Sequence, residues 1–239
     1  MKLKTILALL VLSVSIPFHN VSGDDVLDFM PAIIAGAQSE SSEIESPEIE
    51  NPDGVVLNRN FTTTTDFFGD LLIVGEISNN TDSAIQFVSI DANIFNGGQL
   101  VETAFSFVFR EIMPPRSTSC FRMSTGYAGP FTRVSFEPID FIEPISQRAP
   151  LSISNVTRRA DFVGDIELLG TVTNNSSRRA ESVIVSSTFY ASDNSVIDCE
   201  IAFLGSSSLN AGQSGNFNMI TFTPNSSVSR FVLQPSGTL

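Results

Sequence analysis

One stretch of thirteen residues occurs twice in the chain. The first copy, over 69–81, reads Gly-Asp-Leu-Leu-Ile-Val-Gly-Glu-Ile-Ser-Asn-Asn-Thr, and the second, over 164–176, reads Gly-Asp-Ile-Glu-Leu-Leu-Gly-Thr-Val-Thr-Asn-Asn-Ser. The two are offset by 95 positions with no insertion. A repeat at this spacing indicates two copies of one structural unit, each of an ordinary size for a domain.

Apolar residues alternate within the repeat and in the segment after it, which is the period of a β-strand. On the first strand the alternating residues are Leu71, Ile73, Gly75 and Ile77, matched in the second copy by Ile166, Leu168, Gly170 and Val172. On the second strand they are Val88, Ile90, Ala92 and Ile94, matched by Val183, Val185, Ser187 and Phe189. Further alternating segments follow in each copy, separated by Gly, Asn and Pro turns.

The sequence therefore predicts an all-β protein made of two tandem antiparallel immunoglobulin-like β-sandwich domains. We expect domain 1 over residues 54–144 and domain 2 over 151–239. Residues 145–150 form the linker between them, and it is short enough for the two domains to contact each other.

The first 53 residues have a different composition. Lys2 and Lys4 precede an apolar run from Ile6 to Ile16, and small residues follow, which is the pattern of a signal peptide over 1–23. An uncleaved anchor is the alternative. Residues 24–53 carry nine acidic and no basic side chains, which predicts an extended acidic linker. We therefore expect a secreted, extracellular or cell-surface protein with no transmembrane segment after signal removal.

After residue 23 the chain contains no His, Lys or Trp, because the only His and both Lys lie before that point. The formal charge is −13 for the whole chain and −15 without the signal peptide. This balance argues against nucleic acid or an anionic membrane as a partner. Without His or Lys, a Ser-His-Asp unit, a Schiff base and a His-ligated metal are excluded. We expect no enzyme activity and no cofactor.

Carboxylates remain as candidates for chemistry or metal binding. Asp70 and Glu76 could form an acid pair for glycoside hydrolysis, but the second copy has Asp165 and Thr171 there, so the pair is not repeated. Calcium needs only carboxylate and carbonyl oxygens. Asp70, Asp165 and Asp193 are its candidate ligands, with backbone hydrogen bonding in turns as the other interpretation.

The two cysteines, Cys120 and Cys199, occupy non-equivalent positions in the two copies. The disulfide within each domain of an antibody is therefore excluded. Strand alternation places Cys120 outward, next to Phe121, and Cys199 inward. These positions favour two unpaired thiols, and a disulfide between the copies is the alternative.

Two further surface features are visible. The N-glycosylation pattern occurs at Asn60, Asn79, Asn155, Asn174, Asn175 and Asn225. For Asn79 and Asn174 a role in turning the backbone explains the repetition better. The basic doublets 158–159 and 178–179 occur only in the second copy, and they could form one Arg cluster for an acidic partner or be ordinary solvated charge.

The segments Gly75-Glu-Ile-Ser-Asn79 and Gly170-Thr-Val-Thr-Asn174 resemble the FxLYD family, a small immunoglobulin-like module of exported bacterial and archaeal proteins that is often in tandem. The namesake pentad would fall on Ala92–Asn96 and Ser187–Ala191. Both lack the leading Phe, and Asn96 and Ala191 replace the final Asp. The resemblance covers roughly Val55 to Gln234. It implies the fold and a surface location, and it carries no catalytic residues.

Two functions follow from these patterns. The first is a non-enzymatic cell-surface protein that acts through protein–protein contact or envelope assembly, with a protein or an envelope polymer as its partner. Sheet edges and the loop Tyr127–Phe131 are the expected contact surfaces. The second is an extracellular module of an export or uptake system that binds a small ligand, a carbohydrate or calcium.

Overall fold

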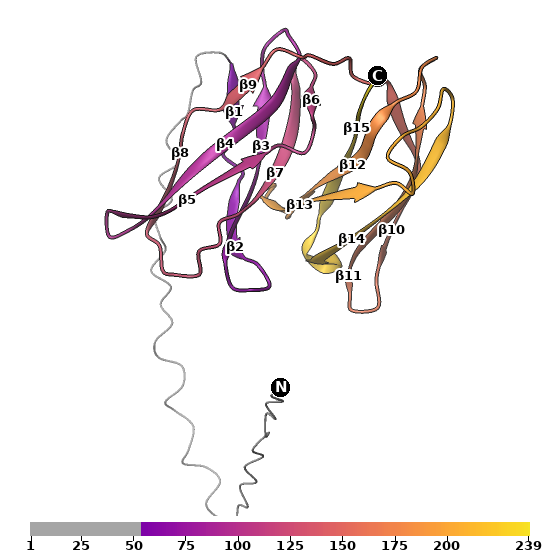
Figure 1. Cartoon of the computed structure of the whole chain (residues 1–239). Helices are drawn as coiled ribbons and strands as arrows, with labels where there is room; N and C mark the ends of the chain where they lie inside the picture. Colours follow the sequence, from indigo (N-terminus) through magenta and orange to yellow (C-terminus); the bar gives the residue numbers. More distant parts are fainter. Residues whose placement is uncertain (1–53) are drawn as a thin grey trace, which may run out of the picture. The chain divides into compact units, whose positions relative to one another are not determined.

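Fifteen β-strands and one short 3₁₀ turn make up the part of the chain that the computed structural model describes, residues 54–239 (Figure 1). All strand pairs are antiparallel, and no α-helix occurs in this range. The prediction of an all-β antiparallel fold is therefore confirmed. None of the described residues forms a helix that is long and apolar enough to cross a membrane.

The first copy contains two sheets. In one, β3 (Leu71–Asn79) pairs with β1 (Val55–Leu57) and β2 (Thr62–Thr65) along one edge and with β7 (Ser117–Ser124) along the other. In the other, β4 (Ile85–Asn96) pairs with β5 (Gln99–Phe107), β6 (Ile112–Met113), β8 (Arg133–Phe136) and β9 (Asp140–Ile142).

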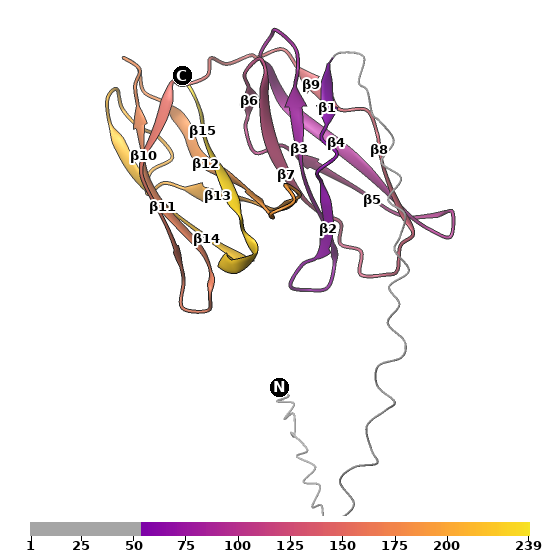
Figure 2. The ribbon, with the colours of Figure 1, turned by 180° about the vertical axis from the view of Figure 1, so that it is seen from behind.

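The second copy also contains two sheets. One has the order β10 (Leu151–Ala160), β11 (Asp165–Asn174) and β14 (Ser214–Pro224), and the 3₁₀ turn Asn225–Ser227 follows β14. The other has the order β13 (Val196–Phe203), β12 (Glu181–Tyr190) and β15 (Arg230–Thr238). The second copy thus repeats the order of the main strands of the first (Figure 2).

Each copy has its own hydrophobic cluster, one drawn from residues 55–139 and one from 149–239. The predicted core residues of β4 and β12 are buried, including Ser187. The described residues nevertheless belong to one compact unit, so the division into domains at 145–150 stays a prediction. The expected signal peptide and acidic linker, 1–23 and 24–53, lie outside the described residues.

The repeated glycines keep space for an aromatic ring. Gly75 lies opposite Phe121 in the β3–β7 pair, and Gly170 lies opposite Phe217 in the β11–β14 pair. A Cβ at Gly170 would lie 2.6 Å from the Phe217 ring, and a Cβ at Gly75 would lie 3.0 Å from the Phe121 ring. Any larger residue would therefore displace the ring.

The repeated asparagines hold the turn that follows the strand. The Asn79 side chain is buried, donates to the carbonyls of Ser83, Met113 and Pro114, and accepts from the amide of Thr81. Asn174 makes the corresponding contacts with the carbonyls at 178, 209 and 210 and the amide at 176. The repeat therefore specifies a scaffold.

One feature of the repeated strand differs from its sequence pattern. In β3 the residues between the core positions, Leu72 and Val74, are also buried, although alternation alone predicts only one buried face. They pack in a small cluster with Tyr190 and Val196 of the second copy. The outer face of β3 is therefore covered by the other copy, and the expected contact between the copies is present.

Candidate functional site

The candidate carboxylate pair does not form. Asp70 and Glu76 lie six residues apart along one extended segment, which separates them by roughly 20 Å. Glu76 is buried. Its carboxylate accepts a hydrogen bond of 2.5 Å from the Tyr190 hydroxyl and another of 3.0 Å from Asn60 Nδ2. The Glu76 carboxylate thus joins the two copies.

The calcium candidates lie in three separate turns. Asp70 follows the β2–β3 turn, Asp165 follows the β10–β11 turn, and Asp193 lies between β12 and β13. Asp193 accepts from the amide and the hydroxyl of Ser195, at 3.0 and 2.7 Å, which lowers its pKa. Within 54–239 no three acidic or Cys side chains gather as a metal site would require.

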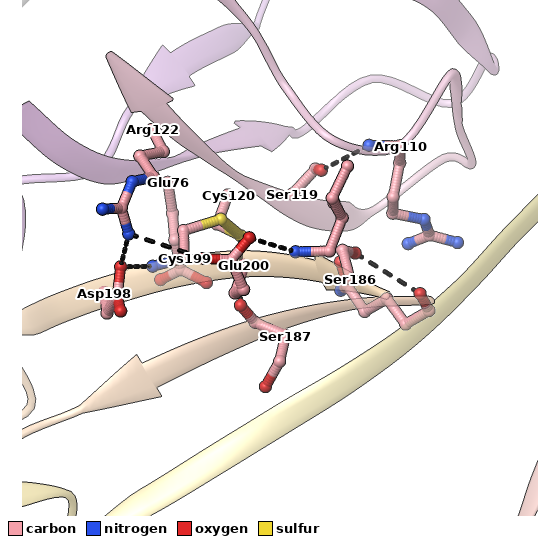
Figure 3. The surroundings of a disulfide bond; sticks show 12 residues. Glu76, Arg110, Ser119, Cys120, Arg122, Ser186, Ser187, Asp198, Cys199 and Glu200 are labelled. Atoms are coloured by element: carbon pink, nitrogen blue, oxygen red, sulfur yellow. Dashed lines mark hydrogen bonds and ion pairs between the residues drawn. A yellow bond between two sulfur atoms is a disulfide. The ribbon is translucent and has the colours of Figure 1, made fainter. Parts of the chain in front are cut away.

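Cys120 in β7 and Cys199 in β13 form a disulfide with a Cα–Cα distance of 6.1 Å (Figure 3). The prediction of unpaired thiols is therefore wrong, and the alternative of a bridge between the copies is confirmed. The inward direction predicted for Cys199 is wrong as well, because its sulfur lies toward β7. Alternation from Cys199 to Phe203 of β13 holds, but the core face is the other one: Ala202 belongs to the second hydrophobic cluster, whereas Cys199 and the exposed Phe203 lie on the opposite face.

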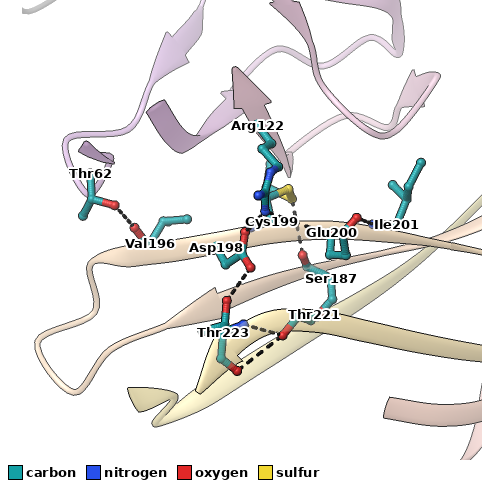
Figure 4. A network of polar contacts seen from close by, with 11 residues as sticks. Thr62, Arg122, Ser187, Val196, Asp198, Cys199, Glu200, Ile201, Thr221 and Thr223 are labelled. Atoms are coloured by element: carbon teal, nitrogen blue, oxygen red, sulfur yellow. Dashed lines mark hydrogen bonds and ion pairs between the residues drawn. A yellow bond between two sulfur atoms is a disulfide. The ribbon is translucent and has the colours of Figure 1, made fainter. Parts of the chain in front are cut away.

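A polar network lies beside the disulfide (Figure 4). Arg122 of β7 donates a hydrogen bond of 2.5 Å to Asp198 of β13 and lies 3.7 Å from Glu200. Thr223 of β14 donates to the other Asp198 oxygen. Burial raises the pKa of Glu200. With the disulfide, these contacts fix the two copies to each other.

The two Arg doublets do not form one cluster. Arg158 and Arg159 lie opposite the first half of β11, and Arg178 and Arg179 follow its far end, roughly 20 Å away. Arg159 pairs with Glu167 at 2.6 Å, which lowers the pKa of that carboxyl, and Arg179 pairs with Glu181 at 2.8 Å. The alternative of a single Arg cluster is therefore excluded, which leaves the interpretation of ordinary surface charge.

The six candidate glycosylation residues differ in accessibility. Asn79 and Asn174 are buried with their amide groups hydrogen-bonded, which favours the turn interpretation. Asn60 and Asn225 are half-buried and also hydrogen-bonded. Asn155 and Asn175 are exposed, and Asn155 lies at an irregularity of β10 with a φ of 55°.

The expected contact loop, Tyr127–Phe131, lies against the hydrophobic cluster of its own copy. Tyr127 and Phe131 pack on the first hydrophobic cluster, and the Tyr127 hydroxyl donates to the Pro130 carbonyl at 2.9 Å. The exposed aromatic side chains lie elsewhere.

Five apolar side chains protrude at one end of the described unit. Phe67 and Phe68 are 95% and 83% exposed at the β2–β3 turn, and Phe162 and Val163 are 98% and 65% exposed at the β10–β11 turn. Phe222, near the end of β14, is 88% exposed. Both turns point the same way in both views (Figures 1 and 2). We call these five residues the aromatic end.

The two turns are copies of each other. Asp66-Phe-Phe-Gly-Asp70 and Asp161-Phe-Val-Gly-Asp165 share the offset of 95 that defines the repeat. In each, the first Asp side chain accepts from two amides of the turn, at 2.8–3.0 Å. Each Gly has the left-handed φ that the turn needs, +87° at Gly69 and +95° at Gly164.

A groove runs between the copies at this end. Its volume is about 640 Å³, and Phe67, Phe68 and Phe222 lie on its walls together with Ile197 and Leu72. Arg122 and Asp198 of the polar network also line it. The Gly164 carbonyl accepts from the amide of Asn225, so the β10–β11 turn adjoins the segment that carries Phe222.

Sequence reasoning missed the aromatic end. The repeat was defined from Gly69 and Gly164, and the preceding Asp-Phe pairs belong to the same alignment. Extending the comparison upstream by three residues would have found an apolar pair inside a turn in both copies, which turn chemistry alone does not require.

Comparison with known proteins leaves the family open. No family model and no curated protein matches the chain. Its structure is similar to that of red sea bream transglutaminase, with 9% sequence identity and a TM-score of 0.26. The match covers 77% of this chain and 29% of the transglutaminase chain. A likeness this distant supports no functional argument, and the FxLYD resemblance stays a prediction.

Proposed function

We propose that the chain is an exported, non-enzymatic protein of two tandem FxLYD-like β-sandwich modules. It acts at the cell surface or in the envelope through protein–protein contact or envelope assembly. The aromatic end is its contact surface. The absence of His and Lys after residue 23 supports a binding function, because most acid–base and nucleophilic catalysis depends on these side chains.

The observation that carries this proposal is the exposure of Phe67 and Phe162 at equivalent turns of the two copies. Exposed aromatic side chains that cluster at one end of a protein are typical of an interaction site. The scaffold supports this function because the Cys120–Cys199 disulfide and the Arg122–Asp198 pair hold the two turns at a fixed separation. A preformed surface loses less conformational entropy on binding.

Photo-crosslinking on intact cells tests the proposal. A photoreactive amino acid replaces Phe67 in one variant and Phe162 in another, and a third variant carries it at Phe105, which is exposed on β5 away from this end. We expect adducts from the first two positions and none from the third. If positions 67 and 162 give no adduct with any protein, polymer or lipid of the envelope, the proposal is wrong.

The alternative function is extracellular binding of a small ligand, a carbohydrate or calcium for export or uptake. The groove of about 640 Å³ beside Phe67 and Phe222 supports it, since this volume suits a small molecule. Calorimetric titration with calcium and with common oligosaccharides separates this function from surface contact. A flat trace for all of them removes it.

A further inference from the structure

We propose that the aromatic end inserts into the surface of an electrically neutral lipid bilayer and so holds the protein at a membrane. This inference rests on one part of the proposed function, that the aromatic end is the contact surface of an exported protein, and it names lipid as the partner there in place of a protein. Phe67, Phe68, Phe162 and Val163 enter the interface between headgroups and acyl chains, and Phe222 lies between the two turns.

The shape of the surface favours a bilayer over a protein. The side chains of Phe67 and Phe162 are almost wholly exposed. The β2–β3 and β10–β11 turns that carry them are two separate projections of the backbone that point the same way (Figures 1 and 2). A stable protein interface needs about 800 Å² of fitted surface on each partner. A bilayer is deformable and accepts separate protrusions that point the same way.

Four backbone amides of each turn are hydrogen-bonded within the turn itself. In the first turn the amides of Asp66, Phe68, Gly69 and Asp70 all donate to acceptors within the turn, at 2.8–3.1 Å. The four equivalent amides of the second turn donate in the same way, at 2.8–3.3 Å. Backbone groups that enter a bilayer must be satisfied internally, and both tips meet this requirement for these donors.

The charges near the tips select the type of lipid. Each tip is flanked by two aspartates, at 66 and 70 and at 161 and 165, and neither turn contains a basic residue. Arg122, which lines the groove beside the first turn, pairs with Asp198. On β10, Arg159 pairs with Glu167, and Arg158 donates to Asn225 and to the Val228 carbonyl. The net charge is −13 for the whole chain and −15 without the signal peptide, so anionic lipid repels the protein and the bilayer surface must be close to neutral.

Sedimentation with phosphatidylcholine vesicles tests the inference. We expect the exported protein to sediment with the vesicles, and the variant F67S/F68S/F162S/V163S to lose at least about tenfold in partitioning, because each apolar side chain contributes to insertion. The variant F105S/F107S removes two other exposed phenylalanines and is the matched control. It should sediment like the wild type.

A single tryptophan reports on the tip directly, because the chain contains none. In the variant F162W, emission should shift to shorter wavelength when phosphatidylcholine vesicles are added, and in F105W it should not shift. Replacing half of the lipid by phosphatidylglycerol should weaken binding at low salt, and added salt should restore part of it.

Three results would overturn the inference: no sedimentation of the wild type, equal loss in the control variant, or stronger binding to the anionic vesicles. If the tips crosslink to an envelope protein while the vesicles bind nothing, the partner is a protein. In that case this inference fails and the proposed function stands. If the vesicles bind but positions 67 and 162 give no adduct in cells, the proposed function fails instead.

Discussion

The Tyr190 hydroxyl of the second copy donates a hydrogen bond of 2.5 Å to Oε1 of Glu76 in the first copy. Both side chains are buried, and the Arg230 guanidinium lies 3.4 Å from the centre of the Tyr190 ring. Burial, followed by the bond to Glu76, raises the pKa of Tyr190 to about 12. The tyrosine therefore stays protonated and keeps the buried carboxylate satisfied at neutral pH.

Removing this hydroxyl should destabilise the fold. In Y190F the ring remains, but the Glu76 carboxylate loses the hydrogen bond from Tyr190 and keeps the one from Asn60 Nδ2. We expect the free energy of unfolding at neutral pH to fall by about 1–3 kcal/mol, the usual cost of a buried polar group that loses its partner. Urea denaturation measures it, and an unchanged midpoint would contradict the assigned contact.

The same variant gives a pH dependence with a defined sign. The Tyr190 pKa is raised from 10.0 to about 12, so its contribution is complete below pH 10 and is lost as the pH rises to about 12. The stability difference between the wild type and Y190F should therefore shrink across this window. If the stability difference between the wild type and Y190F stays constant from pH 8 to about 12, protonation of the Tyr190 hydroxyl is not coupled to folding.

The disulfide closes a long segment, because Cys120 and Cys199 lie 79 residues apart. We expect the variant C120S/C199S to lose about 2–5 kcal/mol in the free energy of unfolding. Alkylation of the unreduced, unfolded protein followed by mass spectrometry checks the bond itself. Two alkylated cysteines in the exported protein would contradict it.

The repeated glycine should not tolerate a methyl group. In G170A the new Cβ would lie 2.6 Å from the Phe217 ring, so we expect a loss of about 1–3 kcal/mol in unfolding free energy. Gly205 has open space around it and is the control, with an expected change within about 0.5 kcal/mol for G205A. Equal effects at both positions would show that ring packing is not the cause.

The adjacent pair Asn174 and Asn175 separates structure from modification. N174A removes three hydrogen bonds donated by Nδ2 of a buried side chain and should cost about 1–3 kcal/mol. N175A removes one exposed bond to Ser152 and should cost much less. Thermal unfolding of the two variants compares them. In glycopeptide analysis we expect any glycan at Asn155 or Asn175 and none at Asn79 or Asn174.

The strands could be predicted from the sequence because alternation and turn residues are local signals. Val88, Ile90 and Ala92 are buried as their spacing predicts, and Asn79 turns the chain where its strand ends. The burial of these core residues and the turn contacts of Asn79 involve only residues of their own copy. The repeat helped as well, since each assignment could be checked at the position 95 residues further on.

The contacts between the copies could not be predicted in this way. Leu72 and Val74 look like outward positions until Val196 covers them, and the partner of Cys120 depends on how two sheets pack. The aromatic end could be predicted from the sequence only in part. Its turns carry a local signal, an apolar pair at equivalent positions of the repeat, but only the structure shows that Phe222 lines the same groove as Phe67 and Phe68.

The central claim is that Phe67, Phe68, Phe162 and Val163 hold the protein at its partner surface, and cell fractionation tests this most directly. The exported protein, F67S/F68S/F162S/V163S and F105S/F107S are each produced in cells, and the washed envelope and the medium are compared. We predict that the wild type and F105S/F107S stay with the envelope and that the tip variant appears in the medium. Retention of the tip variant at the level of the wild type would contradict the account.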